Sequence, residues 1–144
     1  MITRDPSSVL AAAVAARRSA YAPYSSFSVG AALLARDGRL FTGSNIENAS
    51  YGLSMCAERV ALFTAVSQGA RAFDAIAIAG PDGVTTMPCG ACRQVLYEFG
   101  QQMRVIFPQD GHVKMTSLQS LLPEAFSSHS MQSNSPMMER GNYH

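Results

Sequence analysis

The sequence has little positive charge with which to hold a nucleic acid or an anionic membrane. Its 144 residues carry 11 basic and 10 acidic side chains, and Lys114 is the sole lysine. Since the arginines are scattered and form no basic run, nothing in the sequence suits a phosphate backbone. The sequence also lacks an apolar stretch of the roughly 18 residues that a membrane span needs, and it lacks a charged start followed by an apolar signal core. We therefore expect a cytoplasmic protein with neither a nucleic-acid nor a membrane partner.

Cysteine is scarce as well, since the chain contains Cys56, Cys89 and Cys92 and no others. An odd number cannot close a complete set of disulfides. In a reducing compartment, metal binding is the better explanation for cysteines at this spacing. The alternative is that they are small buried hydrophobic residues, and for Cys56 taken by itself that alternative is the stronger one.

The composition suits one domain with a real core. Apolar residues make up 47% of the chain, and a domain of this size buries about 68 to 70% of its unfolded surface. No internal repeat is visible. We place the domain at residues 1–126, because residues 127–144 are rich in Ser, Met, Asn, Gln and Gly and have no apolar period. That last stretch is predicted to be a flexible tail.

The order of secondary-structure signals predicts an α/β fold. Helix signals cover residues 6–21, 56–68, 89–99 and 118–122, and strand signals cover residues 27–35, 39–44, 75–79, 103–107 and, more weakly, 113–115. The Asp37-Gly38 pair between the first two strands is a strong hairpin signal. This order favours a mixed sheet with helices on both faces.

Two motifs at predicted helix starts contain the candidate metal ligands: Cys56-Ala57-Glu58, and the run from Pro88 to Cys92. Cysteines at i and i+3 on a first helical turn project from one face, so Cys89 and Cys92 can reach the same ion, and Cys56 can join them from the other helix. Structural zinc sites are closed by four protein ligands, whereas catalytic sites leave one position for water. Three ligands therefore indicate catalysis. His112 is the in-domain candidate for a fourth ligand, but it follows a predicted turn, and we favour three.

Charge compensation is needed at such a site, because three thiolates and one divalent ion sum to −1. Two helix N-termini contribute roughly +0.5 each. Arg59 can donate hydrogen bonds to the sulfurs, as a residue that contacts the ligands rather than the metal. Arg93 is a second candidate, although an arginine there can equally form a surface or interface ion pair.

Glu58 is interpreted as the proton carrier of the site, because a carboxylate beside the water position can take and return protons. The alternative is a first-turn glutamate that merely complements the helix dipole. Taken alone, that alternative is stronger, but three nearby cysteines reverse the balance.

The Cys-x-Glu and Pro-Cys-x-x-Cys pair is the signature of zinc deaminases, with cysteine in place of the first histidine. Together with the stretches NIENASYG (45–52) and PCGACRQ (88–94), it makes residues 5–126 similar to the short-chain cytidine deaminases. The resemblance implies a three-layer α/β/α sandwich around a mixed five-stranded sheet, and a homotetramer. It also implies hydrolytic release of ammonia from cytidine and deoxycytidine, giving uridine and deoxyuridine in pyrimidine salvage.

The resemblance also implies a role for each site residue. In this reading one Zn²⁺ per subunit is held by Cys56, Cys89 and Cys92, the proton shuttle is Glu58, and the substrate contacts are Phe27, Asn45, Glu47, Ala57 and Phe126. Asn45 and Glu47 match the pair that holds the sugar 3′-hydroxyl, and Phe27 matches the aromatic wall beside the base. Phe126 matches a phenylalanine offered to a neighbouring subunit's site. Without the resemblance, simple core packing is the stronger interpretation of the two phenylalanines, and a polar loop cap remains an alternative for Asn45 and Glu47.

Three other functions compete with this one. A deaminase of a cytosine-containing antibiotic nucleoside of the blasticidin S type keeps the chemistry, but the Asn45 and Glu47 pair disfavours it. A nucleotide or polynucleotide deaminase needs cationic groups for phosphate, and lysine is nearly absent. The third is a non-enzymatic interaction module in which zinc only ties two helices together.

Overall fold

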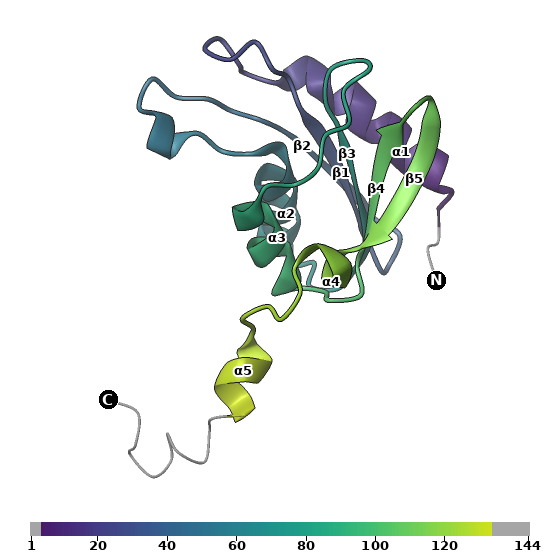
Figure 1. Ribbon diagram of the computed structural model, residues 1–144, viewed down its shortest axis with the longest axis vertical. Helices are drawn as coiled ribbons and strands as arrows, with labels where there is room; N and C mark the ends of the chain where they lie inside the picture. The colour runs from purple at the N-terminus through teal and green to yellow at the C-terminus, as the bar shows by residue number, and fades with distance from the viewer. Residues whose placement is uncertain (1–3, 134–144) are drawn as a thin grey trace.

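The computed structural model describes residues 4–133, in which five strands form one mixed sheet between layers of helices (Figure 1). The strands are β1 (Gly30–Ala35), β2 (Leu40–Ser44), β3 (Phe73–Ala79), β4 (Arg104–Gln109) and β5 (His112–Ser117). Their spatial order is β2-β1-β3-β4-β5. The β3 and β4 pair is parallel and the other neighbouring pairs are antiparallel. The predicted α/β class and mixed sheet are confirmed.

Helices cover both faces of the sheet because the strand side chains alternate between them. On one face, Val9, Leu10 and Ala13 of α1 (Pro6–Ala16) pack with Leu34 and with several alanines of the sheet. The other face carries α2 (Ala57–Ser67), α3 (Gly90–Tyr97) and the short α4 (Leu118–Leu121). The residues of β1, which lies between β2 and β3, are all buried as a result.

Two glycines let the helices approach the sheet closely. A Cβ on Gly30 would lie 2.0 Å from the carbonyl oxygen of Ala13, and a Cβ on Gly43 would lie 2.5 Å from the backbone nitrogen of Ala61. Backbone atoms cannot give way to such contacts. Glycine at these two positions therefore allows α1 and α2 to pack closely against β1 and β2.

The first strand begins at Gly30, three residues later than predicted, because side chains form hydrogen bonds with the backbone groups of residues 27–29. Asn45 donates Nδ2 to the carbonyl of Phe27 (2.8 Å) and accepts at Oδ1 from the nitrogen of Val29 (2.9 Å). Arg17 donates Nε to the carbonyl of Ser28 (3.0 Å). Residues 27–29 are consequently a loop, which ends beside the last residue of β2.

Other boundaries also differ from the predictions. The first helix ends at Ala16 and continues as a 3₁₀ turn over Arg17–Ser19, with a second 3₁₀ turn at Tyr51–Leu53. Strand β5 is longer than predicted because it pairs with β4 along its whole length. Within the predicted tail, Ser128–Ser133 form helix α5, which lies apart from the layered sheet (Figure 1). The domain boundary at residue 126 stays a prediction, and residues 134–144 lie outside the described part.

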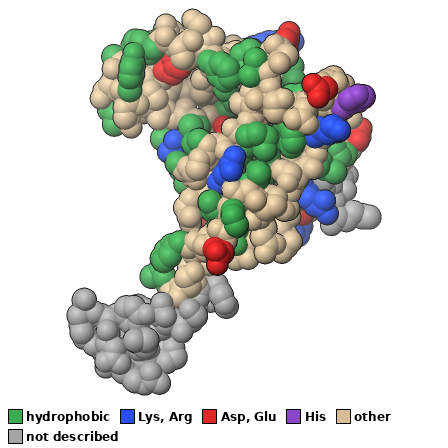
Figure 2. All heavy atoms as spheres, viewed as in Figure 1, with side chains coloured by type: hydrophobic (Ala, Val, Ile, Leu, Met, Phe, Trp, Pro, Cys, Tyr) green, Lys and Arg blue, Asp and Glu red, His purple; other side chains and the backbone are tan. Residues whose placement is uncertain are grey.

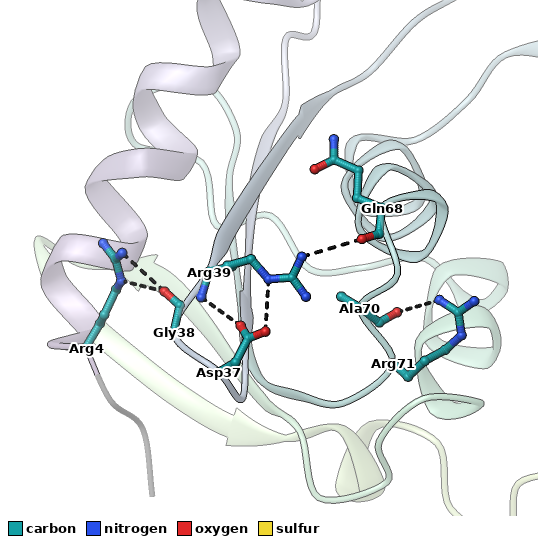
Figure 3. A network of polar contacts seen from close by, with 7 residues as sticks. All are labelled: Arg4, Asp37, Gly38, Arg39, Gln68, Ala70 and Arg71. Carbon is teal, nitrogen blue, oxygen red and sulfur yellow. Dashed lines mark hydrogen bonds and ion pairs between the residues drawn. The ribbon is translucent and has the colours of Figure 1, made fainter.

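Arg39 connects the hairpin turn between β1 and β2 to the C-terminal end of α2 (Figure 3). Arg39 donates Nε to Asp37 Oδ2 (2.9 Å) and Nη1 to the carbonyl of Gln68 (3.5 Å). The backbone nitrogen of Arg39 also donates to Asp37 and holds the pKa of that carboxyl below its usual range. Nearby, Arg71 donates Nη1 to the carbonyls of Val66 (2.8 Å) and Ala70 (2.9 Å).

On the face drawn in Figure 2, basic and acidic side chains are interspersed. Within the described part of the chain, no helix is long and apolar enough to cross a membrane.

Candidate functional site

Three thiols meet where α2 and α3 begin. Cys56 is the N-cap of α2, Cys89 is the N-cap of α3, and Cys92 lies buried in the first turn of α3. Their sulfur atoms all lie within 4.8 Å of one another, and those of Cys56 and Cys89 are 3.9 Å apart. Zinc–sulfur bonds of about 2.3 Å place the sulfurs of a tetrahedral site about 3.8 Å apart. The donor set and its spacing therefore fit one zinc ion.

Positive charge is directed at the sulfurs, as the charge argument from sequence requires. Both helix N-termini point toward the thiols. Arg59 donates Nη2 to the sulfur of Cys56 (3.3 Å). The neighbouring Cys92 thiol, helped by the Arg59 guanidinium, lowers the pKa of Cys56 to about 5, and the same contacts raise the pKa of Arg59. Cys56 therefore ionises more readily than an ordinary thiol.

Glu58 lies in the first turn of α2, and only 4% of it is exposed. Burial raises the pKa of its carboxyl to about 7. A glutamate that merely complements a helix dipole stays in solvent, where no such rise occurs. The structure thus places a carboxyl that can gain or lose a proton near neutrality beside the sulfur cluster.

A cavity of about 250 Å³ opens beside the thiols. It is lined by Val29, Asn45, Glu47, Ser54, Met55, Cys56, Ala57, Glu58, Thr86, Met87 and Cys89. The structure thereby brings Asn45, Glu47 and Ala57, which were predicted to contact substrate, together with two of the predicted metal ligands and with Glu58, the predicted proton carrier. The segment after β2, the start of α2 and the loop before α3 all reach this edge of the sheet.

Two predicted contacts lie outside the lining. Phe27 is 38% exposed, and its ring edge lies 3.5 Å from the position that a Cβ of Gly80 would take, next to Thr86. Phe126 is 64% exposed, and Gln94 donates Nε2 to its carbonyl (2.8 Å). Core packing, the alternative for both phenylalanines, does not describe side chains this exposed.

Asn45 and Glu47 both hold the loop before β1. Besides the Asn45 contacts described above, Glu47 Oε1 accepts from the nitrogens of Tyr24 (3.0 Å) and Ser25 (3.1 Å), and Oε2 accepts from the Ser25 hydroxyl. The Ser25 hydroxyl is the main reason that the pKa of Glu47 lies below its usual range. A polar loop cap, the alternative interpretation, is therefore part of what these two residues do.

Arg93 and His112, weighed as further members of the site, lie elsewhere. Arg93 donates Nε to the carbonyl of Pro88 (2.7 Å) and Nη1 to that of Leu121 (2.9 Å), so it clamps the backbone next to Cys89. His112 opens β5 and is not in the cluster of metal-binding side chains found among the described residues. The three-sulfur set is the arrangement that the structure supports.

The sequence arguments missed several residues of the cavity. Ser54 and Met55 directly precede Cys56, and Thr86 and Met87 directly precede Pro88. Proximity to the motifs was a signal that could have identified them. The Thr86 hydroxyl is buried and has no hydrogen-bond partner among the described residues. Ser25 gave no signal, because its importance comes from contacts made across the fold.

A larger cavity, of about 480 Å³, lies elsewhere on the molecule, and Arg36, Asp74 and Arg104 are among its lining residues. Its lining, as far as the chain is described, contains no cysteine. Size favours this cavity over the one beside the thiols, whereas the chemistry of the lining residues favours the smaller one.

Comparisons with known proteins agree with the geometry. The family described as cytidine and deoxycytidylate deaminase zinc-binding region matches residues 3–108. A curated cytidine deaminase of Sporosarcina psychrophila is 46% identical over 125 residues, which cover 85% of this chain and 92% of the relative. The crystal structure of cytidine deaminase from Burkholderia pseudomallei is 50% identical, with a TM-score of 0.81, and the match covers 85% of this chain and 100% of that one.

The cytidine deaminase structure from Mycobacterium tuberculosis is 41% identical, with a TM-score of 0.76, over 85% of this chain and 98% of that one. The three thiols and Glu58 lie inside the residues that match the family, whereas Phe126 lies beyond them. A match of this extent, centred on a cluster that fits zinc, means that the chain belongs to the zinc-dependent cytidine and deoxycytidylate deaminase family.

Proposed function

We propose that this protein hydrolyses cytidine and deoxycytidine to uridine and deoxyuridine with release of ammonia. One observation carries the proposal: two of three thiols that fit a zinc ion, and a buried carboxyl, line the same cavity as an amide and a carboxylate suited to a sugar. Each part alone has a structural explanation. Their convergence at one edge of the sheet is what hydrolytic deamination of a nucleoside requires.

The metal centre consists of Cys56, Cys89 and Cys92. A zinc ion held by three protein ligands supplies Lewis-acid activation of water. Arg59 and the two helix N-termini offset the negative charge of the thiolates, which would otherwise oppose that activation.

Glu58 carries the protons. The net reaction adds one water at C4 of the cytosine ring and breaks the C4–N4 bond, so that one ammonia leaves. Glu58 takes a proton from the attacking water and delivers it to the ring nitrogen N3. It then takes the second proton, from the hydroxyl now on C4, and passes it to the amino group, so that the C4 carbonyl forms as the C4–N4 bond breaks. Its pKa of about 7 suits both directions of transfer near neutral pH.

The nucleoside is held by groups on the other side of the cavity. Asn45 and Glu47 bind the 3′-hydroxyl, Ala57 contacts the base, and Phe27 forms a wall beside it. The Glu47 carboxylate repels a phosphate placed near the sugar. The pair therefore favours a nucleoside over a nucleotide.

We propose further that the enzyme is a cytoplasmic homotetramer acting in pyrimidine salvage. Two features support shared active sites: Phe126 is 64% exposed, and its backbone is fixed by Gln94. An aromatic side chain displayed on an anchored segment is suited to burial against a neighbouring subunit. Gel filtration with light scattering tests the subunit number, and a Phe126→Ala variant tests whether Phe126 reaches substrate.

A comparison of substrates tests the activity. Purified protein with zinc is incubated in turn with cytidine, cytidine monophosphate, a cytosine-containing oligonucleotide and blasticidin S, and the loss of ultraviolet absorbance is followed. Turnover of cytidine at a kcat/KM at least a hundredfold above the other three is the expected result. A preference for the monophosphate, the oligonucleotide or the antibiotic would contradict the proposed substrate.

A further inference from the structure

We infer that Ser25 is a positioning residue that fixes Glu47 and Phe27 relative to each other, and so couples recognition of the sugar hydroxyl to the wall beside the base. The inference rests on the proposed function. It is carried by hydrogen bonds that join the loop before β1 to the segment after β2.

The Ser25 hydroxyl makes two of these bonds. It donates to Glu47 Oε2 and accepts from the backbone nitrogen of Phe27 at 3.0 Å. Ser26 between them has a φ of 58°, which is uncommon for a residue with a side chain. That conformation accompanies the turn in which the nitrogen of Phe27 reaches back to Ser25. One hydroxyl thus links the carboxylate to the peptide that carries the aromatic ring.

The contacts that the described residues make leave the carboxylate of Glu47 with one free acceptor position. Two carboxylate oxygens offer about four lone-pair sites. The nitrogens of Tyr24 and Ser25 use two sites on Oε1, and the Ser25 hydroxyl uses one on Oε2. The single remaining site on Oε2 can accept one hydrogen bond, from a substrate hydroxyl that approaches from one direction. Without the Ser25 hydroxyl, Oε2 has two free sites and no fixed orientation.

Phe27 is held on both sides by residues of the sugar site. Its nitrogen donates to Ser25, which is bonded to Glu47, and its carbonyl accepts from Asn45 Nδ2. A displacement of Glu47 therefore shifts the backbone of Phe27. Loss of this link should therefore affect a substrate with a 3′-hydroxyl more than one without it. A residue that merely stabilises the loop would affect both substrates equally.

The experiment compares cytidine with 3′-deoxycytidine as substrates of the zinc-loaded protein. The wild type is expected to prefer cytidine strongly in kcat/KM. In Ser25→Ala the KM for cytidine should rise about tenfold, since the bond lost involves a charged group. The kcat should change by less than about threefold, and the preference for cytidine should fall at least fivefold.

Two other variants separate positioning from loop stability. Ser25→Thr keeps the hydroxyl at an exposed position and should retain the wild-type preference. Ser28→Ala removes a different hydrogen bond of the same loop, the one from Arg17 Nη2 (2.9 Å), and should leave the preference unchanged. Zinc content and melting temperature of each variant are measured alongside.

Each remaining outcome has a definite meaning. If Ser25→Ala slows both substrates equally, or Ser28→Ala reproduces its effect, or Ser25→Thr fails to retain the preference, Ser25 does not position Glu47 and the inference is wrong. If the zinc-loaded wild type does not turn over cytidine at all, the proposed function fails and the inference fails with it.

Discussion

The two ends of helix α2 use arginine in opposite ways. At the C-terminal end, Arg39 donates to the backbone carbonyl of Gln68 and Arg71 to that of Ala70 (Figure 3). Arg71 donates to the carbonyl of Val66 as well, and the charge of both arginines complements the negative end of the helix dipole. At the N-terminal end, Arg59 lies against the positive end of the same dipole. It is held there by the sulfur of Cys56 at 3.3 Å.

The difference identifies which end is functional. An arginine at a helix C-terminus is explained by the helix itself, whereas an arginine at an N-terminus needs a negative partner. Here the partner is the sulfur of Cys56, which belongs to a cluster of three thiols beside a buried carboxyl. About 16 Å of helix separates the two settings, so changes at one end can be compared with changes at the other in the same molecule.

The largest expected effect comes from removing a sulfur. Cys89→Ala should lose zinc, reduce cytidine turnover below detection and lower the melting temperature by about 5 to 10 °C, since two helix starts are no longer tied at one ion. Elemental analysis and thermal unfolding check this, with chelator-treated wild type as the control. One zinc per chain in the variant would contradict the ligand assignment.

Glu58→Gln tests the proton carrier next to the sulfurs. The amide keeps the size of the side chain but cannot carry protons, so zinc should stay bound while kcat falls by about 10²- to 10⁴-fold. The measurement pairs zinc content with initial rates on cytidine. A variant that keeps both zinc and turnover would remove Glu58 from the mechanism. Absence of turnover in the wild type as well would favour the zinc-stabilised interaction module.

Arg59→Ala sharpens the comparison of the two ends directly. Loss of the bond to Cys56 should weaken zinc affinity by about 10- to 100-fold, the usual range for groups that orient metal ligands. Competition with a chromogenic chelator measures the affinity. If the affinity stays within twofold of the wild type, Arg59 has no role in charge compensation at the thiolates.

Arg71→Ala is the matched change at the other end, and its expected effect is the smallest. It removes the bonds to the carbonyls of Val66 and Ala70 and should lower the unfolding free energy by about 0.3 to 1 kcal/mol. Zinc affinity and kcat/KM for cytidine should equal those of the wild type. A loss of either would mean that the two ends are coupled.

The sequence allowed the metal cluster to be predicted because the motifs that contain its residues are local. The spacing of Cys89 and Cys92 places their sulfurs on one helical turn, and the motif with Cys56 marks a second helix start. The fold then brings Cys56 to within 3.9 Å of Cys89, 33 residues away in the sequence. Glu58 follows from the same helix start. The hairpin signal and the order of helix and strand signals are local too, and the mixed sheet was predicted from them.

Other features depend on contacts between distant segments. The late start of β1 results from Asn45 and Arg17, which bind the backbone of residues 27–29. The link from Glu47 to Ser25 joins two segments 22 residues apart, and no sequence motif predicts it. Helix α5 formed in a stretch whose composition had suggested none. The roles of the individual substrate-binding residues remain predictions for experiment.

Titration of metal-free protein with zinc tests most directly whether a three-sulfur centre in each chain performs the chemistry. Uridine formation from cytidine is measured after each addition. The rate should rise in proportion to zinc and reach a plateau at one ion per chain. Full activity in the absence of zinc, or a plateau well away from one ion per chain, would contradict the account.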